Sequence, residues 1–181
     1  MKLSLDQLNR LKTDEFKRKE KFPLIIVLDN IRSMMNIGSV FRTSDAFRLE
    51  KILLCGITAC PPHKEIHKTA LGATESVAWE YFENTCHAVD KLKEQGYQVL
   101  ALEQTTESKS LVDFQPLPHD RYALVFGNEV KGVQDDVLHC CHASIEIPQF
   151  GTKHSFNIAV SAGIVLWDFF TKMQYYKTFT P

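Results

Sequence analysis

The hydrophobic residues of this chain fall into short continuous runs separated by longer polar or amphipathic stretches. The run "LIIVL" (24–28) shows no polar alternation, which is typical of a strand that is buried on both faces. "SVAWEYF" alternates only weakly and gives a less distinct strand. These patterns predict strands at 24–28, 51–57, 76–82, 97–103, 122–127 and 144–148.

Between these runs, apolar residues recur at the three- or four-residue spacing of helices. Near the start, Ser4 and Gln7 fit a capping box, and Leu5, Leu8 and Leu11 follow at helical spacing. The predicted helices are 5–19, 37–47, 63–70, 85–95 with Thr85 as its cap, 134–141, and a long apolar helix at 156–173.

Strands that alternate with helices predict an α/β fold, with a mostly parallel sheet and helices on both of its faces. The length of 181 residues suits one domain, which we place at 22–175 after an N-terminal helical extension at 1–21. In such sheets, ligands bind at the carboxyl ends of the strands.

The net charge of −1 favours no particular partner, but the charge is unevenly distributed. Residues 1–21 hold seven Lys or Arg against four Asp or Glu, a net charge of +3. The cluster "KRKEK" (17–21) is either a solvated helix end or a contact for a phosphate backbone. The start does not resemble a signal peptide, and no run of about 18 apolar residues occurs, so we expect a cytoplasmic protein without a membrane span.

Five cysteines without a secretory signal predict free thiols. The sequence "HCCH" (139–142) suggests a metal site at first sight. Neighbouring residues of a helix point about 100° apart, so four in a row do not converge on one ion. We therefore expect no metal site.

Three polar segments that contain glycine follow predicted strands and lead into helices, at 29–47, 126–133 and 147–157. Because carboxyl ends of parallel strands share one edge of a sheet, we expect the three to meet there. Each segment alone is also explained as ordinary turn chemistry. None matches a P-loop, a dinucleotide-binding glycine motif or a hydrolase nucleophile elbow.

The three segments resemble, in order and spacing, the three motifs of the SpoU (TrmH-like) branch of the SPOUT RNA 2′-O-ribose methyltransferases. The similar stretches are "NIGSVFRTSDAF" (36–47), "LVFGNEVKGV" (124–133) and "IPQFGTKHSFNIAVSAGIVL" (147–166), with "TALGA" (69–73) as a further match. The resemblance covers 23–173. It implies a deep C-terminal trefoil knot that forms an S-adenosylmethionine pocket, and a homodimer that completes the site.

Arg42 interrupts an apolar stretch, and the resemblance implies that it is the catalytic arginine. Its place in catalysis is either a base or a fixed cation that binds an RNA phosphate beside the target ribose. By the same resemblance, Asn36 is its polar neighbour; the two are six residues apart, and we expect them to meet across a loop and a first helical turn. Glu129 is expected to hold Arg42 or Asn36, and Ser155 and Asn157 to line the site or cap the helix that follows.

The resemblance implies that S-adenosylmethionine rests on the second and third segments and that no metal is needed. The residues expected to bind it are Gly127, Asn128, Glu129, Ile147, Phe150, Gly151 and Phe156. Three positions depart from the family pattern: Arg48, Val130 and Phe156. Of these, Val130 puts the geometry of the second turn in question.

The implied reaction is methylation of a ribose 2′-hydroxyl in structured RNA. Transfer RNA is the preferred substrate, because the chain offers no room for an additional N-terminal RNA-binding domain and begins with a basic segment. Ribosomal RNA is one alternative. The others are a non-catalytic RNA-binding protein with the same fold and a nucleotide-binding α/β protein unrelated to RNA.

Overall fold

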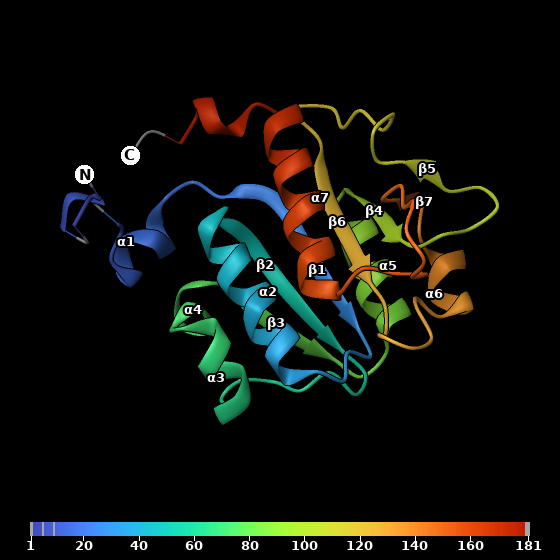
Figure 1. Cartoon of the computed structure of the whole chain (residues 1–181), viewed down its shortest axis with the longest axis horizontal. Helices are drawn as coiled ribbons and strands as arrows, with labels where there is room; N and C mark the ends of the chain where they lie inside the picture. The colour runs from blue at the N-terminus through green and yellow to red at the C-terminus, as the bar shows by residue number, and fades with distance from the viewer. Residues whose placement is uncertain (1, 5, 9, 180–181) are drawn as a thin grey trace.

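The computed structural model describes residues 2–4, 6–8 and 10–179. Its centre is a seven-stranded sheet in the order β3-β2-β1-β6-β4-β7-β5, in which all neighbouring strands are parallel (Figure 1). The strands are β1 (Phe22–Asp29), β2 (Leu49–Cys55), β3 (Trp79–Phe82), β4 (Tyr97–Leu102), β5 (Lys109–Ser110), β6 (Arg121–Phe126) and β7 (Ala143–Glu146).

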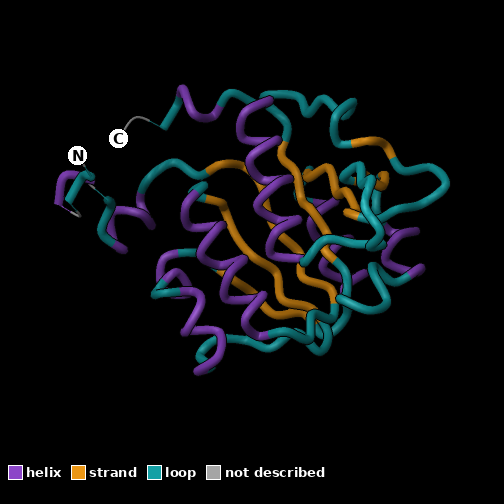
Figure 2. Tube along the Cα trace, in the orientation of Figure 1, coloured by secondary structure: helices purple, strands orange, loops and turns teal. Residues whose placement is uncertain are grey.

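Helices cover both faces of the sheet (Figure 2). They are α1 (Thr13–Arg18), α2 (Met34–Ala46), α3 (Lys64–Ala70), α4 (Ala73–Ser76), α5 (Thr85–Glu94), α6 (Asp135–Cys140) and α7 (Ile158–Lys172), with 3-10 turns η1 (Asp6–Leu8) and η2 (Tyr175–Lys177). The predicted α/β fold with a parallel sheet is confirmed.

The central strands explain the two layers of helices, because successive side chains of a strand point to opposite faces. Leu24, Ile26 and Leu28 of β1 belong to the core under α2 and α7. Ile25 and Val27 belong to the core under α5 and α6. A strand that is buried on both faces needs an apolar residue at every position, which is what the run "LIIVL" provides.

The structure differs from the predicted elements in small ways. The predicted helix at 5–19 is wrong, because the described part of this stretch holds only η1 and α1, with residues 10–12 in coil between them. Leu5 lies outside the described residues. Ser4 and Gln7 do form the predicted reciprocal capping pair, on η1. Asn84 caps α5 in place of Thr85, since its side chain accepts the His87 N–H at 3.2 Å.

The predicted domain boundary follows residue 21, but α1, which precedes it, packs on the rest of the chain. Phe16 of α1 is buried in the core beside α4. β1 begins at Phe22. Among the residues that the structure describes, no helix is long and apolar enough to cross a membrane.

α2 and α3 pack unusually closely, and Gly38 makes this possible. A Cβ at Gly38 would overlap the Thr69 hydroxyl and the Ile66 carbonyl oxygen of α3. The Thr69 hydroxyl instead donates to the Met35 carbonyl at 2.9 Å. The helix that carries the first motif is therefore fixed to α3 by backbone proximity and by this hydrogen bond.

Candidate active site

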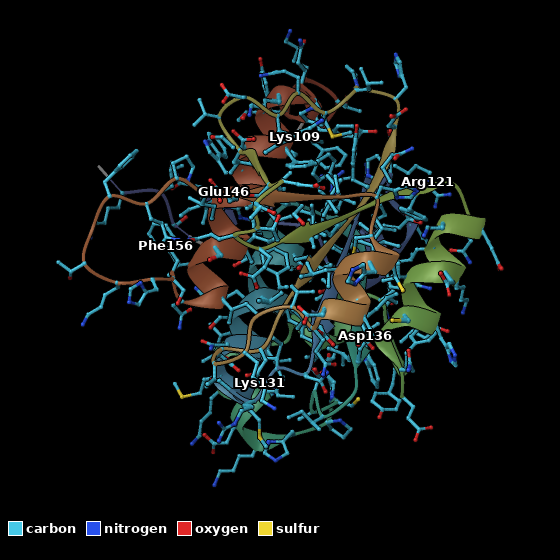
Figure 3. All side chains as sticks on the ribbon, turned by 90° about the vertical axis from the view of Figure 1, so that its right-hand side faces the viewer. Lys109, Arg121, Lys131, Asp136, Glu146 and Phe156 are labelled. Atoms are coloured by element: carbon cyan, nitrogen blue, oxygen red, sulfur yellow. The ribbon has the colours of Figure 1, made fainter. Side chains whose placement is uncertain are left out.

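The three motif segments meet at the carboxyl edge of the sheet, as predicted. They follow β1, β6 and β7, and β1 and β6 are neighbours in the sheet. β4 lies between β6 and β7, so the loop that follows β4 enters the same region. The last connection, 147–157, returns from β7 to α7 beside the loop after β6; Figure 3 labels Lys131 in that loop and Phe156 near the end of the connection.

The Glu129 carboxylate joins the second motif to the first. It accepts the backbone N–H groups of Arg32 and Ser33, both at 3.0 Å, and the side-chain amide of Asn36 at 3.4 Å. Partial burial opposes ionisation, but these donors outweigh it, so the pKa of Glu129 lies below its usual value. The predicted contact between Glu129 and Asn36 is present.

Asn157 joins the third motif to the first and also caps α7. Its side-chain oxygen accepts the Ala159 N–H at 2.9 Å, which is the N-cap bond of the helix. Its amide nitrogen donates to the Asn36 side-chain oxygen at 3.1 Å. A polar chain Glu129–Asn36–Asn157 therefore connects all three segments. Ser155 does not cap α7 and lines the neighbouring pocket.

Arg42 lies apart from this polar chain within a single copy of the protein. It is exposed on α2, where Ile37, Val40 and Phe41 are buried against the sheet. Asn36 and Arg42 lie on the same helix, about 9 Å apart along its axis and about 120° apart around it, since each residue adds about 1.5 Å and 100°. The expectation that they meet across a loop is therefore wrong. Arg42 makes no hydrogen bond or ion pair to any residue that the structure describes.

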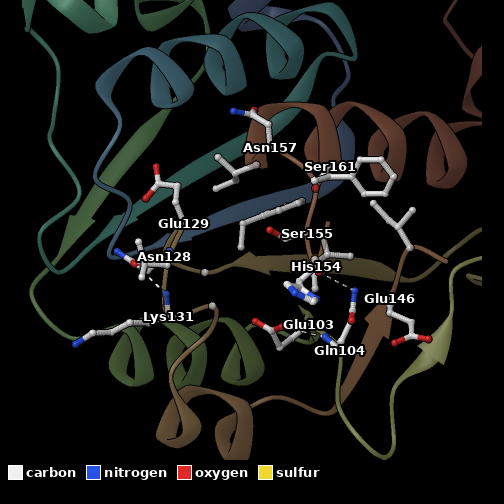
Figure 4. A pocket seen from close by; sticks show the side chains of 18 of the residues that line it. Glu103, Gln104, Asn128, Glu129, Lys131, Glu146, His154, Ser155, Asn157 and Ser161 are labelled. Carbon is white, nitrogen blue, oxygen red and sulfur yellow. Dashed lines mark hydrogen bonds between the residues drawn. The ribbon is translucent and has the colours of Figure 1, made fainter. Parts of the chain in front are cut away.

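A pocket of about 520 Å³ opens beside the polar chain, between the loops after β4, β6 and β7 (Figure 4). Five of the residues expected to bind a cofactor line it: Gly127, Asn128, Glu129, Ile147 and Phe156. Phe150 and Gly151 do not line it, and Phe150 is 97% exposed.

The loop after β6 is a closed turn, and Asn128 holds it together. Its backbone exchanges hydrogen bonds with Gly132 at 2.9 and 2.8 Å, and its side-chain oxygen accepts the Val130 N–H at 3.0 Å. Its amide nitrogen donates to the Asn30 carbonyl at 2.7 Å. The turn forms with Val130 in place, and that side chain is exposed.

Two glycines let this turn approach its neighbours. A Cβ at Gly127 would overlap the backbone of Gly132 and Val133. Gly132 has φ +69°, and a Cβ there would overlap the Glu103 carboxylate. Both glycines therefore have steric reasons for their places in the motif.

Glu103 is a pocket residue that the sequence analysis missed. One carboxylate oxygen accepts the Val133 N–H at 2.9 Å, and the other accepts the Gln104 N–H at 3.0 Å. In Figure 4, Glu103 and Gln104 lie across the pocket from Glu129. The only available signal was a carboxylate as the last residue of the predicted strand 97–103, before a loop without glycine.

The described residues hold no cluster of three or more His, Cys, Asp or Glu side chains that could bind a metal ion. All five cysteines are free thiols, as expected. In the "HCCH" sequence, the His142 ring nitrogen accepts the Val99 N–H at 3.0 Å, so this histidine joins the turn between α6 and β7 to β4.

The comparisons with known proteins all point to the same family. The SpoU rRNA Methylase family profile matches residues 23–167. A 23S rRNA (guanosine-2′-O-)-methyltransferase RlmB of Neisseria meningitidis is 32% identical over 144 residues, which are 80% of this chain and 56% of that protein. The chain thus spans little more than half of that relative.

Solved structures show the same fold. A TrmH/SpoU tRNA modifying enzyme of A. aeolicus has a TM-score of 0.76 at 24% identity, over 90% of this chain and 80% of its own. An AdoMet-bound rRNA methyltransferase of Sinorhizobium meliloti has a TM-score of 0.76 at 25% identity, over 88% of this chain and 59% of its own. These matches confirm the expected SPOUT fold with its knot, and the chain belongs to the SpoU rRNA methylase family.

Proposed function

We propose that this protein transfers a methyl group from S-adenosylmethionine to a ribose 2′-hydroxyl of RNA. The observation that carries the proposal is the polar chain Glu129–Asn36–Asn157, which connects all three motif loops beside an open pocket. A fold alone does not define a function, so the proposal is supported by the hydrogen bonds among Glu129, Asn36 and Asn157 rather than by the fold.

The pocket suits an adenosyl cofactor. Its volume of about 520 Å³ lies within the usual range of about 300–1,000 Å³ for small-molecule sites. Ile147 and Phe156 offer apolar surface for a ring, and the glycine-containing turn after β6 offers backbone groups. Glu103 and Glu129 add carboxylates on opposite sides, to pair with hydroxyl or amine groups of the ligand. When bound, S-adenosylmethionine supplies a methyl group that its sulfonium has already activated.

Arg42 is the proposed catalytic cation. Its guanidinium is exposed and has no partner among the described residues, so it is available to an RNA phosphate. Guanidinium keeps its proton in proteins, which favours Arg42 as a cation that stabilises the developing 2′-alkoxide over Arg42 as a base; the hydroxyl proton then passes to water. A planar fork binds phosphate with two hydrogen bonds, so we expect Arg42→Lys to lose most activity.

We propose that two copies of the chain form the working enzyme. Arg42 lies outside the pocket lining of its own chain. Val160 and Trp167 on α7 are 50% and 59% exposed, and because they are seven residues apart they lie on the same face of the helix. Pairing through α7 would cover them and bring the Arg42 of one copy to the pocket of the other. Sedimentation tests this: an active monomer would contradict it.

Transfer RNA is the proposed substrate, and ribosomal RNA is the alternative. The support for tRNA is the basic segment 1–21, whose helix α1 packs beside α4 and which can contact a phosphate backbone. The rRNA alternative rests on the similarity to the Neisseria relative. Methyl transfer to purified tRNA and to purified rRNA, measured side by side, distinguishes them. The cytoplasmic location stays a prediction.

The test of the function is methyl transfer from labelled S-adenosylmethionine to total RNA, followed by mapping of 2′-O-methyl sites. We expect methyl transfer by the unmodified protein and loss of methyl transfer in Arg42→Ala. Calorimetry should show that Arg42→Ala still binds S-adenosylmethionine. Cofactor binding without transfer to any RNA would favour the non-catalytic RNA-binding protein instead.

A further inference from the structure

A second hollow, of about 710 Å³, lies away from the carboxyl edge of the sheet. It is bordered by α3, the start of α4, the turn before α3 and the edge strand β3. Its lining includes one carboxylate, that of Glu75, beside the aromatic, cationic and imidazole side chains of Trp79, Lys64, Lys68, His63 and His67. None of these residues contributes to the pocket described above.

Trp79 presents an aromatic surface on an edge strand. β3 pairs with β2 on one side and ends the sheet on the other. Trp79 and Tyr81 point to the same face because they are two residues apart, and they are 37% and 47% exposed. Glu80, on the opposite face, binds Lys51 at 3.3 Å and Lys91 at 2.7 Å. The two aromatic side chains therefore face the side of α3 and are only partly covered.

The cations of α3 stand beside this aromatic surface. Lys64, His67 and Lys68 are three and four residues apart, so they share one face of the helix. Lys68 pairs with Glu65 at 2.7 Å, whereas Lys64 has no hydrogen bond or ion pair to any described residue. An aromatic surface next to cations is the usual means of holding an unstacked nucleotide, with the base on the ring and the phosphate on the cation.

This hollow is rigidly connected to the helix that carries Arg42. The contact of Gly38 with the Ile66 carbonyl and the hydrogen bond from Thr69 to Met35 hold α3 against α2. Figure 1 shows α3 directly beside α2. A nucleotide fixed on α3 would therefore have a defined position relative to the proposed catalytic arginine.

We propose that this hollow binds an unstacked nucleotide of the RNA substrate, distinct from the nucleotide that is methylated. The base stacks on Trp79, and its phosphate contacts Lys64 and Lys68. The inference rests on the proposed function for its RNA substrate. It adds a contact that fixes the register of the RNA relative to Arg42.

Tryptophan fluorescence tests binding without any methyl transfer. The chain has two tryptophans, so Trp167→Phe leaves Trp79 as the only one, and Trp79→Phe leaves only Trp167. Titration of the first variant with poly(U) and with bulk tRNA should quench its emission in a saturable, salt-sensitive manner. The second variant should show clearly less quenching over the same range. Unchanged Trp79 emission at RNA concentrations that saturate binding would overturn the proposal, and would favour a protein partner for this surface.

Steady-state kinetics test the contribution to catalysis. Trp79→Ala should raise the KM for RNA about tenfold, whereas Trp79→Phe should largely restore it, because a phenyl ring still stacks. Lys64→Ala should reduce the magnitude of the slope of log affinity against log salt concentration by about 1, which corresponds to the loss of one phosphate contact. The KM for S-adenosylmethionine should not change.

The matched controls are Tyr176→Ala, which removes another exposed aromatic ring, and Lys109→Ala, at the other edge of the sheet. Both should behave like the unmodified protein. A Trp79→Ala protein that melts normally and keeps its KM for RNA would overturn the inference. Such a result would leave the proposed function intact, whereas absence of methyl transfer in the unmodified protein would count against the function alone.

Discussion

Replacement of Glu129 by alanine probes the polar chain that connects the motif loops. The substitution leaves two backbone N–H groups and the Asn36 amide without their acceptor. A hydrogen bond to a charged group contributes about 1.5–3 kcal/mol when buried, but Glu129 is only partly buried, so solvent screens the interaction. We take about 0.5–1 kcal/mol for each backbone N–H, or about 1–2 kcal/mol in total.

If that energy positions the loops for the reaction, kcat/KM should fall about 5- to 30-fold in Glu129→Ala, since about 1.4 kcal/mol corresponds to a factor of ten. The midpoint of thermal unfolding should fall by about 2–8 °C. Methyl transfer and thermal melting measure the two effects. Glu94→Ala, which removes an exposed carboxylate of α5, is the control and should change neither. Activity of Glu129→Ala within twofold of the unmodified protein would refute the reasoning.

Three further predictions concern packing and pH. Gly127→Ala would press a methyl group against the Val133 backbone, so calorimetry should show at least tenfold weaker S-adenosylmethionine binding; equal affinity would contradict the close approach. Gly38→Ala would overlap the Ile66 carbonyl, so unfolding in urea should show about 1–3 kcal/mol lower stability, and an unchanged midpoint would count against it. Because the pKa of Glu129 is lowered in the folded state, its stabilisation is fully present above about pH 4.5 and is lost as the pH falls through the lower folded value. The melting temperature of Glu129→Gln should therefore change less with pH in that acid range than the melting temperature of the unmodified protein. The same pH dependence in both proteins would disprove the link.

The alternation of strands and helices could be predicted because the burial of a strand determines the pattern of apolar residues in its sequence. β1 is buried on both faces and reads as an unbroken apolar run, so both its position and its neighbours follow. β5 was missed, because a strand of two residues, Lys109 and Ser110, has no periodicity to detect. The N-terminal helix failed for the opposite reason. Its leucine spacing fits a helix, but Leu8 is only half-buried and Leu11 is 37% exposed, so little packing supports one.

The site could be predicted only where sequence position determines spatial position. Segments that follow parallel strands share an edge, so the meeting of the three motifs was predictable. Glu103 was not, because the order of β4 between β6 and β7 is not visible in the sequence. The separation of Asn36 from Arg42 depended on the true start of α2 at Met34, three residues before the predicted start.

The knot could not be predicted from the helices and strands alone. Rules for chain connections exclude threaded loops, because almost all folds obey them. The expectation of a knot came from resemblance to a family, and the match to solved structures confirmed it. Strand order and hydrophobic pattern would have been equally compatible with an unknotted sheet.

The central claim is that the three motif segments form one catalytic site, which the Arg42 of a second copy completes. The most direct measurement is transfer of labelled methyl from S-adenosylmethionine to RNA by the unmodified protein and by Arg42→Ala, with cofactor binding measured on both. The account predicts 2′-O-methylated RNA from the unmodified protein, and loss of transfer with retained cofactor binding in Arg42→Ala. Full transfer by Arg42→Ala would contradict it.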